Sequence, residues 1–170
     1  MVTGGAVRVG RAISLALARA GADIVQIFDS WAGILSPEQY NEFALPCIAR
    51  ICDAIDEVPK IVFAKGAFFA RSEMNALSCD VVGLDWNMEI EESRKLLPSK
   101  VLQGNLDPCA LYGSFDDIRR ETKKMLKAFG PAGHNHLAHA GAEVGEVADR
   151  ELLDDAQHET ADDGAGQARH

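Results

Sequence analysis

Short runs of apolar, mostly β-branched residues alternate with amphipathic helical stretches along residues 21–130. Each run ends in a polar or acidic residue, and an amphipathic helix follows it. The runs are Asp23–Phe28, Lys60–Ala64, Asp80–Leu84 and Lys100–Gln103, and they end in Asp29-Ser30, Lys65-Gly66, Asp85-Trp86 and Gly104-Asn105. Alternating strands and helices predict a parallel sheet, either open or closed into a barrel. Residues just past the carboxyl ends of such strands line the ligand site, so a small-molecule site is expected there.

Capping residues mark where the predicted helices begin and end. Ser36-Pro37-Glu38 begins a helix whose apolar face extends to Ile55. Ser114 begins a helix over Phe115–Phe129, and Gly130-Pro131 ends it. Weaker patterns predict a strand, glycine turn and helix within 1–22, helices near 70–77 and 90–97, a turn at 105–108, a short strand within 134–141 and a short acidic helix beyond it.

Chain length and charge limit the fold and the partners. A complete eight-unit barrel usually needs ~250 residues, so a chain of 170 residues can hold only part of one. Nine acidic residues and one basic residue lie between 143 and 163, so most of the net charge of −9 belongs to a solvated, disordered tail. The sequence shows no basic stripe for nucleic acid and no apolar run of about 18 residues for a membrane span. Four cysteines without CxxC spacing suit a reducing cytoplasm.

Several phrases between residues 21 and 130 closely resemble the uroporphyrinogen decarboxylase family. They are "QIFDSWAGILSPEQYNEFALP", "IVFAKG", "VVGLDW" and "LQGNLDPCALY", and they occur in the family's order. The resemblance is to the carboxyl-terminal part of that family's barrel. The related cobalamin methyltransferases share the architecture, but "FDSWAG" and "LQGNLDP" favour the decarboxylase branch.

The resemblance implies a cofactor-independent carboxy-lyase of haem and porphyrin biosynthesis. Such an enzyme converts uroporphyrinogen III to coproporphyrinogen III, and protonation of a pyrrole carbon lets carbon dioxide leave the attached acetate. Ser30 matches a family position that contacts substrate, and Phe28 and Asp29 beside it match in type and place. His139 matches the histidine of a later family loop, although the glycines of that loop are alanines here.

The resemblance also implies that this chain lacks most of the family's machinery. We find no counterpart for the family's pyrrole-binding aspartate, its substrate arginines or its tyrosine. The 170-residue chain alone is therefore expected to be inactive. Because an incomplete barrel exposes strand edges, the chain is also expected to self-associate, for example as a homodimer. An alternative from another class is a non-catalytic fragment that only associates with itself or with a full-length homologue.

Residues 2–25 resemble a different family, the short-chain dehydrogenases of the pteridine-reductase type. Gly4, Arg8 and Gly10 match a TGxxxRxG pattern that places a helix amino terminus against a pyrophosphate. No dehydrogenase Tyr-x-x-x-Lys follows, so the hypothesis is a chimeric or mis-assembled reading frame. The competing interpretation is an amphipathic helix packed on the next strand, and no NADP binding is expected.

Other polar residues have structural explanations that compete with functional ones. His134, His136 and His139 could ligate a metal, but no convincing fourth ligand accompanies them, so no metal site is predicted. Asp85 and Asp107 could be acids or bases, but bracing of their loops is favoured. Lys65 is well placed to meet an anionic substrate, and Trp31, Trp86, Phe68 and Phe69 could wall a macrocycle or simply pack.

The sequence thus predicts an α/β fold containing four or five βα units of a TIM barrel. We divide the chain into a divergent or dehydrogenase-like amino-terminal βα unit over 1–22, a partial barrel over 23–141 and an acidic tail over 142–170.

Overall fold

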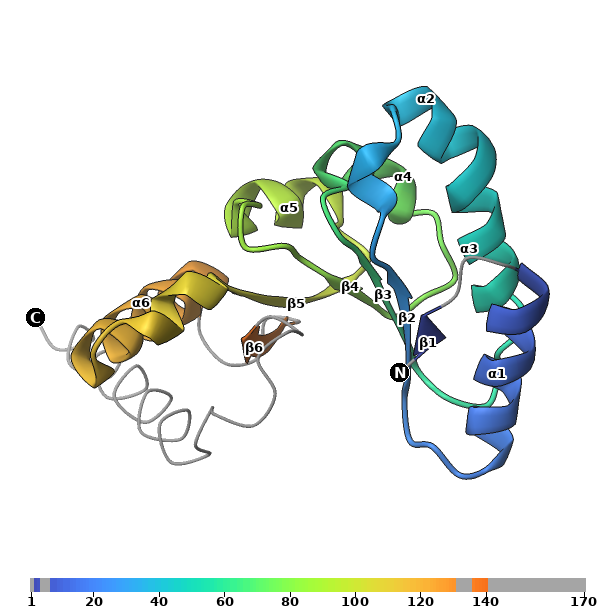
Figure 1. Cartoon of the computed structure of the whole chain (residues 1–170), viewed down its shortest axis with the longest axis horizontal. Coiled ribbons are helices and arrows are strands. Elements are labelled where there is room, and N and C mark those ends of the chain that lie inside the picture. The colour runs from blue at the N-terminus through green and yellow to red at the C-terminus, as the bar shows by residue number, and fades with distance from the viewer. Residues whose placement is uncertain (1, 4–6, 131–135, 141–170) are drawn as a thin grey trace, which may run out of the picture.

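A computed structural model describes residues 2–3, 7–130 and 136–140 of the chain. Six strands form one sheet in which every neighbouring pair is parallel and the strand order follows the sequence (Figure 1). The strands are β1 (Val2–Thr3), β2 (Val25–Asp29), β3 (Lys60–Ala64), β4 (Val81–Gly83), β5 (Val101–Leu106) and β6 (His136–Ala140). Parallel neighbours require a crossover between each pair.

Helical segments provide these crossovers. The α-helices are α1 (Val7–Arg19), α2 (Pro37–Gln39), α3 (Leu45–Cys52), α4 (Arg71–Met74), α5 (Ile90–Leu96) and α6 (Phe115–Phe129). In Figure 1, α1 and α3 lie side by side near one edge of the sheet and α6 lies near the other. Sequential parallel strands with intervening helices are the arrangement of a TIM barrel. Among the described residues β1 and β6 are the edge strands, so the predicted partial barrel is confirmed.

The two faces of the sheet differ in burial. Ile27, Val62, Val82 and Leu102 are register partners across β2 to β5, and all belong to the buried core that also contains helix residues. This row therefore faces the helices. Because strand side chains alternate, the neighbouring row of Phe28, Phe63, Gly83 and Gln103 faces the other side, which we call the lumen face. The Phe28 and Phe63 rings meet edge to face there, with centroids 5.8 Å apart.

The helix that begins at Ser36 differs from the single helix predicted. Its capping box with Gln39 is present, but a π-helical turn at Tyr40–Ala44 separates α2 from α3, which ends at Cys52 rather than near Ile55. Pro46 in the first turn of α3 explains this interruption, because proline lacks an N–H and clashes with the carbonyl four residues earlier. The weak helix near 70–77 is likewise shorter, with a 3₁₀ turn at Phe68–Ala70 before α4.

The turn predicted at 105–108 was wrong in its first half. Asn105 and Leu106 belong to β5, because they pair in register with His139 and Ala140 of β6. The short strand expected within 134–141 is confirmed as β6. The acidic helix and disordered tail predicted beyond Gly141 lie outside the described residues.

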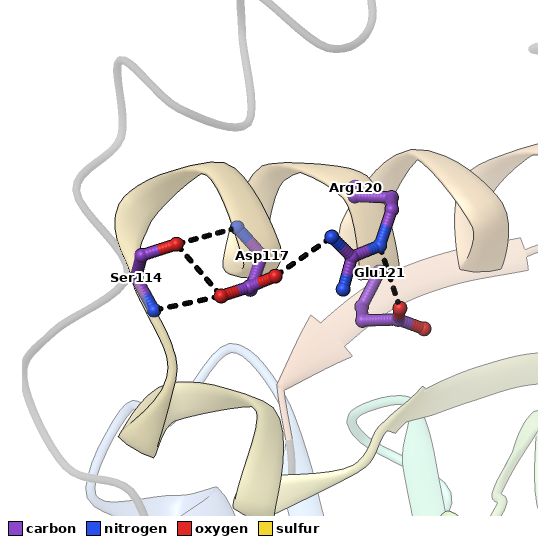
Figure 2. A network of polar contacts seen from close by, with 4 residues as sticks. All are labelled: Ser114, Asp117, Arg120 and Glu121. Carbon is purple, nitrogen blue, oxygen red and sulfur yellow. Dashed lines mark hydrogen bonds and ion pairs between the residues drawn. The ribbon is translucent and has the colours of Figure 1, made fainter.

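The amino terminus of α6 is fixed by a polar network (Figure 2). Asp117 N donates to Ser114 Oγ at 3.3 Å, and Ser114 N donates to Asp117 Oδ2 at 3.1 Å. Arg120 Nη1 donates to Asp117 Oδ1 at 2.7 Å and its Nε to Glu121 at 3.2 Å. The hydrogen bonds from Ser114 and then Arg120 lower the pKa of Asp117 to about 2. The predicted helix over Phe115–Phe129 is confirmed, and Gly130 follows it with φ of 88°.

No helix within the described ranges combines the length and the apolar character that crossing a bilayer requires.

Candidate active site at the carboxyl ends of the strands

Polar residues continue the lumen-face row beyond the ends of the strands. Asn105 is the register partner of His139, and the residues that follow the same alternation on the other strands are Ser30, Lys65 and Asp85. We call these five positions the rim row. The row brings a hydroxyl, an ammonium, a carboxylate and an amide to one end of the sheet, where parallel α/β folds bind ligands.

A pocket of about 620 Å³ opens beside the carboxyl end of β2. Phe28, Asp29 and Ser30 all line it, so the structure brings together three of the predicted site residues. Its other walls are apolar and come from the following loop and helical segments, among them Trp31, Ile34, Phe43, Cys47, Ile48 and Ile51. The pocket is therefore an apolar groove with a few polar groups at one end, the usual character of a small-molecule site.

Asp29 borders this pocket from the helix side, whereas Phe28 and Ser30 belong to the lumen side. By strand alternation Asp29 shares its face with Val25 and Ile27, and its Oδ1 accepts a hydrogen bond from Trp31 N at 3.3 Å. Burial raises the pKa of the Asp29 carboxyl above its ordinary value. Burial and then the Asp29 charge also raise the pKa of Tyr40, whose side chain is fully buried. The charge of Asp29 therefore acts on the pKa of Tyr40, and the Asp29 side chain lies on the helix face of the sheet, opposite the lumen face.

Asp85 and Asp107 brace loops, as the sequence favoured. Asp85 is only 3% exposed, and its Oδ2 accepts a hydrogen bond from Gly66 N at 2.7 Å, in the loop after β3. Asp107 accepts from Cys109 N at 2.8 Å and caps its own 3₁₀ turn. Asn105 Nδ2 donates to the carbonyl oxygens of Asp85 at 3.0 Å and Met88 at 2.7 Å.

Aromatic side chains project from the loops after four consecutive strands. They are Trp31, Phe68, Trp86 and Tyr112, which are 73%, 55%, 44% and 92% exposed. Lys65 Nζ lies 5.9 Å from the centre of the Trp86 ring, a cation–π contact next to the rim row. Sequence reasoning missed Tyr112 as a member of this group, although its place after β5 was the available signal.

A comparison of the chain with models of protein families identifies one family. The model of the family described as uroporphyrinogen decarboxylase (URO-D) matches residues 8–151, which is most of the chain. The chain belongs to the uroporphyrinogen decarboxylase family.

Curated members of the family are similar over 72% of the chain. The uroporphyrinogen decarboxylase of Schizosaccharomyces pombe is 42% identical over 133 residues, covering 72% of this chain and 37% of the relative. That of Chlorobium phaeobacteroides is 48% identical over 127 residues, covering 72% of this chain and 35% of the relative. The chain thus spans about a third of the length of the curated relatives it matches.

A solved structure agrees on the fold. A methyltransferase from Methanosarcina mazei superposes with a TM-score of 0.73 at 20% identity, covering 91% of this chain and 48% of that chain. At this identity the likeness shows the architecture alone, a TIM-barrel type of fold of which this chain holds part.

The remaining predicted family residue, His139, lies in β6 opposite Asn105. Its backbone therefore reaches the rim row, while its side chain lies outside what the structure describes, as do those of His134 and His136. Within the described residues no three His, Cys, Asp or Glu side chains are grouped as metal ligands.

The dehydrogenase-like motif is only partly described. Gly4 lies outside the described residues, Arg8 is described by its backbone in the first turn of α1, and Gly10 is buried in the same helix. The family match begins at residue 8 and includes α1. The chimera hypothesis stays a prediction.

Proposed function

We propose that the chain forms the carboxyl-terminal side of a uroporphyrinogen decarboxylase cleft. In this proposal it converts uroporphyrinogen III to coproporphyrinogen III only when the remaining barrel strands are supplied. The observation that carries the proposal is that Phe28, Asp29 and Ser30 line one pocket at the carboxyl end of β2 in a parallel sheet. Family membership supports the reaction class. A reducing cytoplasm is the proposed location, which suits four unpaired cysteines.

The proposed chemistry requires a proton to be added to a pyrrole carbon so that the ring can accept electrons. Carbon dioxide then leaves the acetate, a second proton converts the remaining carbon to a methyl group, and the ring carbon releases the first proton to restore the pyrrole. In this scheme Ser30 hydrogen-bonds substrate and His139 contacts it from β6. Lys65 attracts an acetate or propionate carboxylate, since its ammonium lies at the same rim. The exposed aromatic rings cover the faces of the macrocycle.

The expected inactivity of the chain alone follows from the open sheet. Stabilisation of a cationic pyrrole requires a fixed anion in a site that excludes water. Asp85, the rim carboxylate, already accepts a hydrogen bond from Gly66, and the pocket opens at the carboxyl end of β2, in a sheet that is not closed among the described residues. The bound tetrapyrrole would therefore remain in contact with water on one side.

We further infer that the chain self-associates through this open region, with a homodimer as the simplest product. Trp31, Ile34 and Phe43 border the pocket and are 73%, 74% and 60% exposed. Strand edges and exposed apolar side chains favour association. Sedimentation of the chain tests this inference, because a monodisperse monomer with a cooperative thermal transition would contradict it.

Two measurements test the proposed function. Anaerobic incubation of the chain with uroporphyrinogen III should yield no coproporphyrinogen, and turnover well above background would refute the inactivity. Titration with uroporphyrin III, followed by porphyrin fluorescence, should show binding. Ser30→Ala should weaken that binding about fivefold, because a hydrogen bond is lost, whereas Ser72→Ala on the exposed surface of α4 should leave it unchanged.

A further inference from the structure

Three hydrogen bonds hold the segment Lys65–Gly66. Lys65 N donates to Asp29 O at 2.9 Å, and Gly33 N donates to Lys65 O at 2.8 Å. Gly66 N donates to Asp85 Oδ2 at 2.7 Å. The loop 29–33, which carries Ser30, is therefore attached at both ends to the segment Lys65–Gly66, which Asp85 holds from the other side.

The two glycines make this attachment close. A Cβ atom built on Gly33 would lie 2.9 Å from Gly66 Cα, a separation that real Cβ atoms do not tolerate. Gly66 also has φ of +75°, a conformation that favours glycine. Since the two backbones touch, a displacement of Gly66 must displace the loop 29–33.

Asp85 is itself held in place. Its side chain is almost completely buried, and Asn105 Nδ2 donates to its carbonyl oxygen. The same amide donates to Met88 O and so fixes the loop after β4. Asp85 Oδ1 is buried and makes no hydrogen bond to any described residue.

We propose that Asp85 is a positioning residue, which holds Ser30 at the pocket through the segment Lys65–Gly66. We call Asp85, this segment and the loop 29–33 the rim clamp. The inference rests on the proposed role of Ser30 and deepens it, because it assigns the placement of that hydroxyl to a residue on another strand. Asp85 positions the loop because its oxygen accepts the hydrogen bond from Gly66 N, and its negative charge is not needed for this.

Amide hydrogen exchange on the full chain, read residue by residue by NMR, tests the clamp without substrate. In Asp85→Ala, exchange at Gly66 and Gly33 should accelerate at least about tenfold, as expected when a buried hydrogen bond is lost. The amides of Val25 and Val101 donate to Pro59 O and Asp80 O at the opposite edge of the sheet and should be unaffected. Asp107→Ala is the matched control, because it removes a carboxylate at the same edge that caps only its own turn.

Asp85→Asn removes the negative charge but keeps a side-chain oxygen that can accept a hydrogen bond. Asparagine can still accept from Gly66 N, so protection at Gly33 and Gly66 should stay close to wild type. Unchanged protection at Gly33 in Asp85→Ala would overturn the inference, as would an Asn variant as unprotected as the Ala variant. If the Ala variant unfolds, protection of Gly33 in the Asn variant supports the acceptor role. If both variants unfold, Asp85 serves global stability and the inference is wrong.

Uroporphyrin III titration of the same variants connects the clamp to the site. Asp85→Ala should weaken binding as much as Ser30→Ala, and Asp85→Asn should bind like wild type. Equal binding by wild type and Asp85→Ala, with Gly33 exchange accelerated, would overturn the claim that the clamp positions Ser30. Absence of binding by the wild-type chain would instead refute the proposed function, while the exchange results would still decide whether the clamp exists.

Discussion

The two ends of this sheet use their polar side chains differently. At the amino ends of the strands, Lys60 Nζ donates to Ile55 O at 2.8 Å, and Lys100 Nζ donates to Leu77 O and to Cys79 O, the latter at 2.9 Å. These ammonium groups bind carbonyls of neighbouring loops. At the carboxyl ends, Ser30 is exposed and aromatic rings project into solvent. At the amino end the lysine ammonium groups bind loop carbonyls, whereas at the carboxyl end Asp85 and Asn105 brace loops while Ser30 and the aromatic rings stay exposed.

The cysteine thiols at the amino ends of the strands are also in a structural, unreactive environment. Cys52 and Cys79 are buried, and burial raises the pKa of Cys52 to about 12 and that of Cys79 above its ordinary value. Thiolate, the reactive form, is therefore scarce there. In TIM barrels the carboxyl end carries catalysis and the opposite end carries stability, and the buried thiols at the amino end of this sheet fit the second role.

The largest expected effect is at the amino end. Lys100→Met removes the donor to two carbonyl oxygens while keeping much of the aliphatic side chain. Loss of these charge-assisted hydrogen bonds should lower the free energy of unfolding by about 2 kcal/mol. Urea denaturation measures the change, and Lys95→Met on α5 is the matched control. If Lys100→Met lowered the free energy of unfolding no more than Lys95→Met does, the amino end of the sheet would not have the stabilising role that we assign to it.

The ionised Asp29 side chain, at the end of β2, should lower the free energy of unfolding at neutral pH. Its pKa is raised in the folded state, so folding favours its protonated form, and stability falls as pH rises above the ordinary value of 3.8. Asp29→Asn should therefore unfold at higher urea than wild type at neutral pH, and the difference should vanish below pH 3.8. A variant that is less stable at neutral pH would show that the Asp29 charge stabilises the fold.

The smallest effect concerns Asp117, at the exposed cap of α6. Its pKa is lowered to about 2 from 3.8, so its contribution is complete above the ordinary value and is lost as pH falls through about 2. Asp117→Asn should reduce stability at neutral pH and match wild type once the pH is below about 2. Thermal unfolding across this pH range measures it, and a constant difference at every pH would contradict the assignment.

The sequence predicted the parts of the fold that depend on local signals. Runs such as Ile61–Ala64 identified strands, and Ser114 with Gly130 identified the ends of α6, because capping and β-branched residues act over a few positions. Asn105 was mistaken for a turn residue because Asn105-Leu106-Asp107-Pro108 has a turn-like composition, while its pairing with His139 depends on a distant strand.

The roles of the predicted site residues stay a prediction, and the sequence did not show how these residues are connected to the rest of the fold. Phe28, Asp29 and Ser30 do meet at one pocket, but the separation of Asp29 toward Tyr40 follows from strand alternation, and the prediction did not apply that rule. The hydrogen bond from Gly66 to Asp85 joins residues 19 positions apart and has no local signature.

The most direct test of the division between the two ends is a crossed measurement on two variants. Uroporphyrin III affinity and the free energy of unfolding are measured for both Ser30→Ala and Lys100→Met. The account predicts that Ser30→Ala weakens binding about fivefold with unchanged stability, and that Lys100→Met lowers stability with unchanged affinity. Unchanged binding in Ser30→Ala, together with weakened binding by folded Lys100→Met, would contradict it.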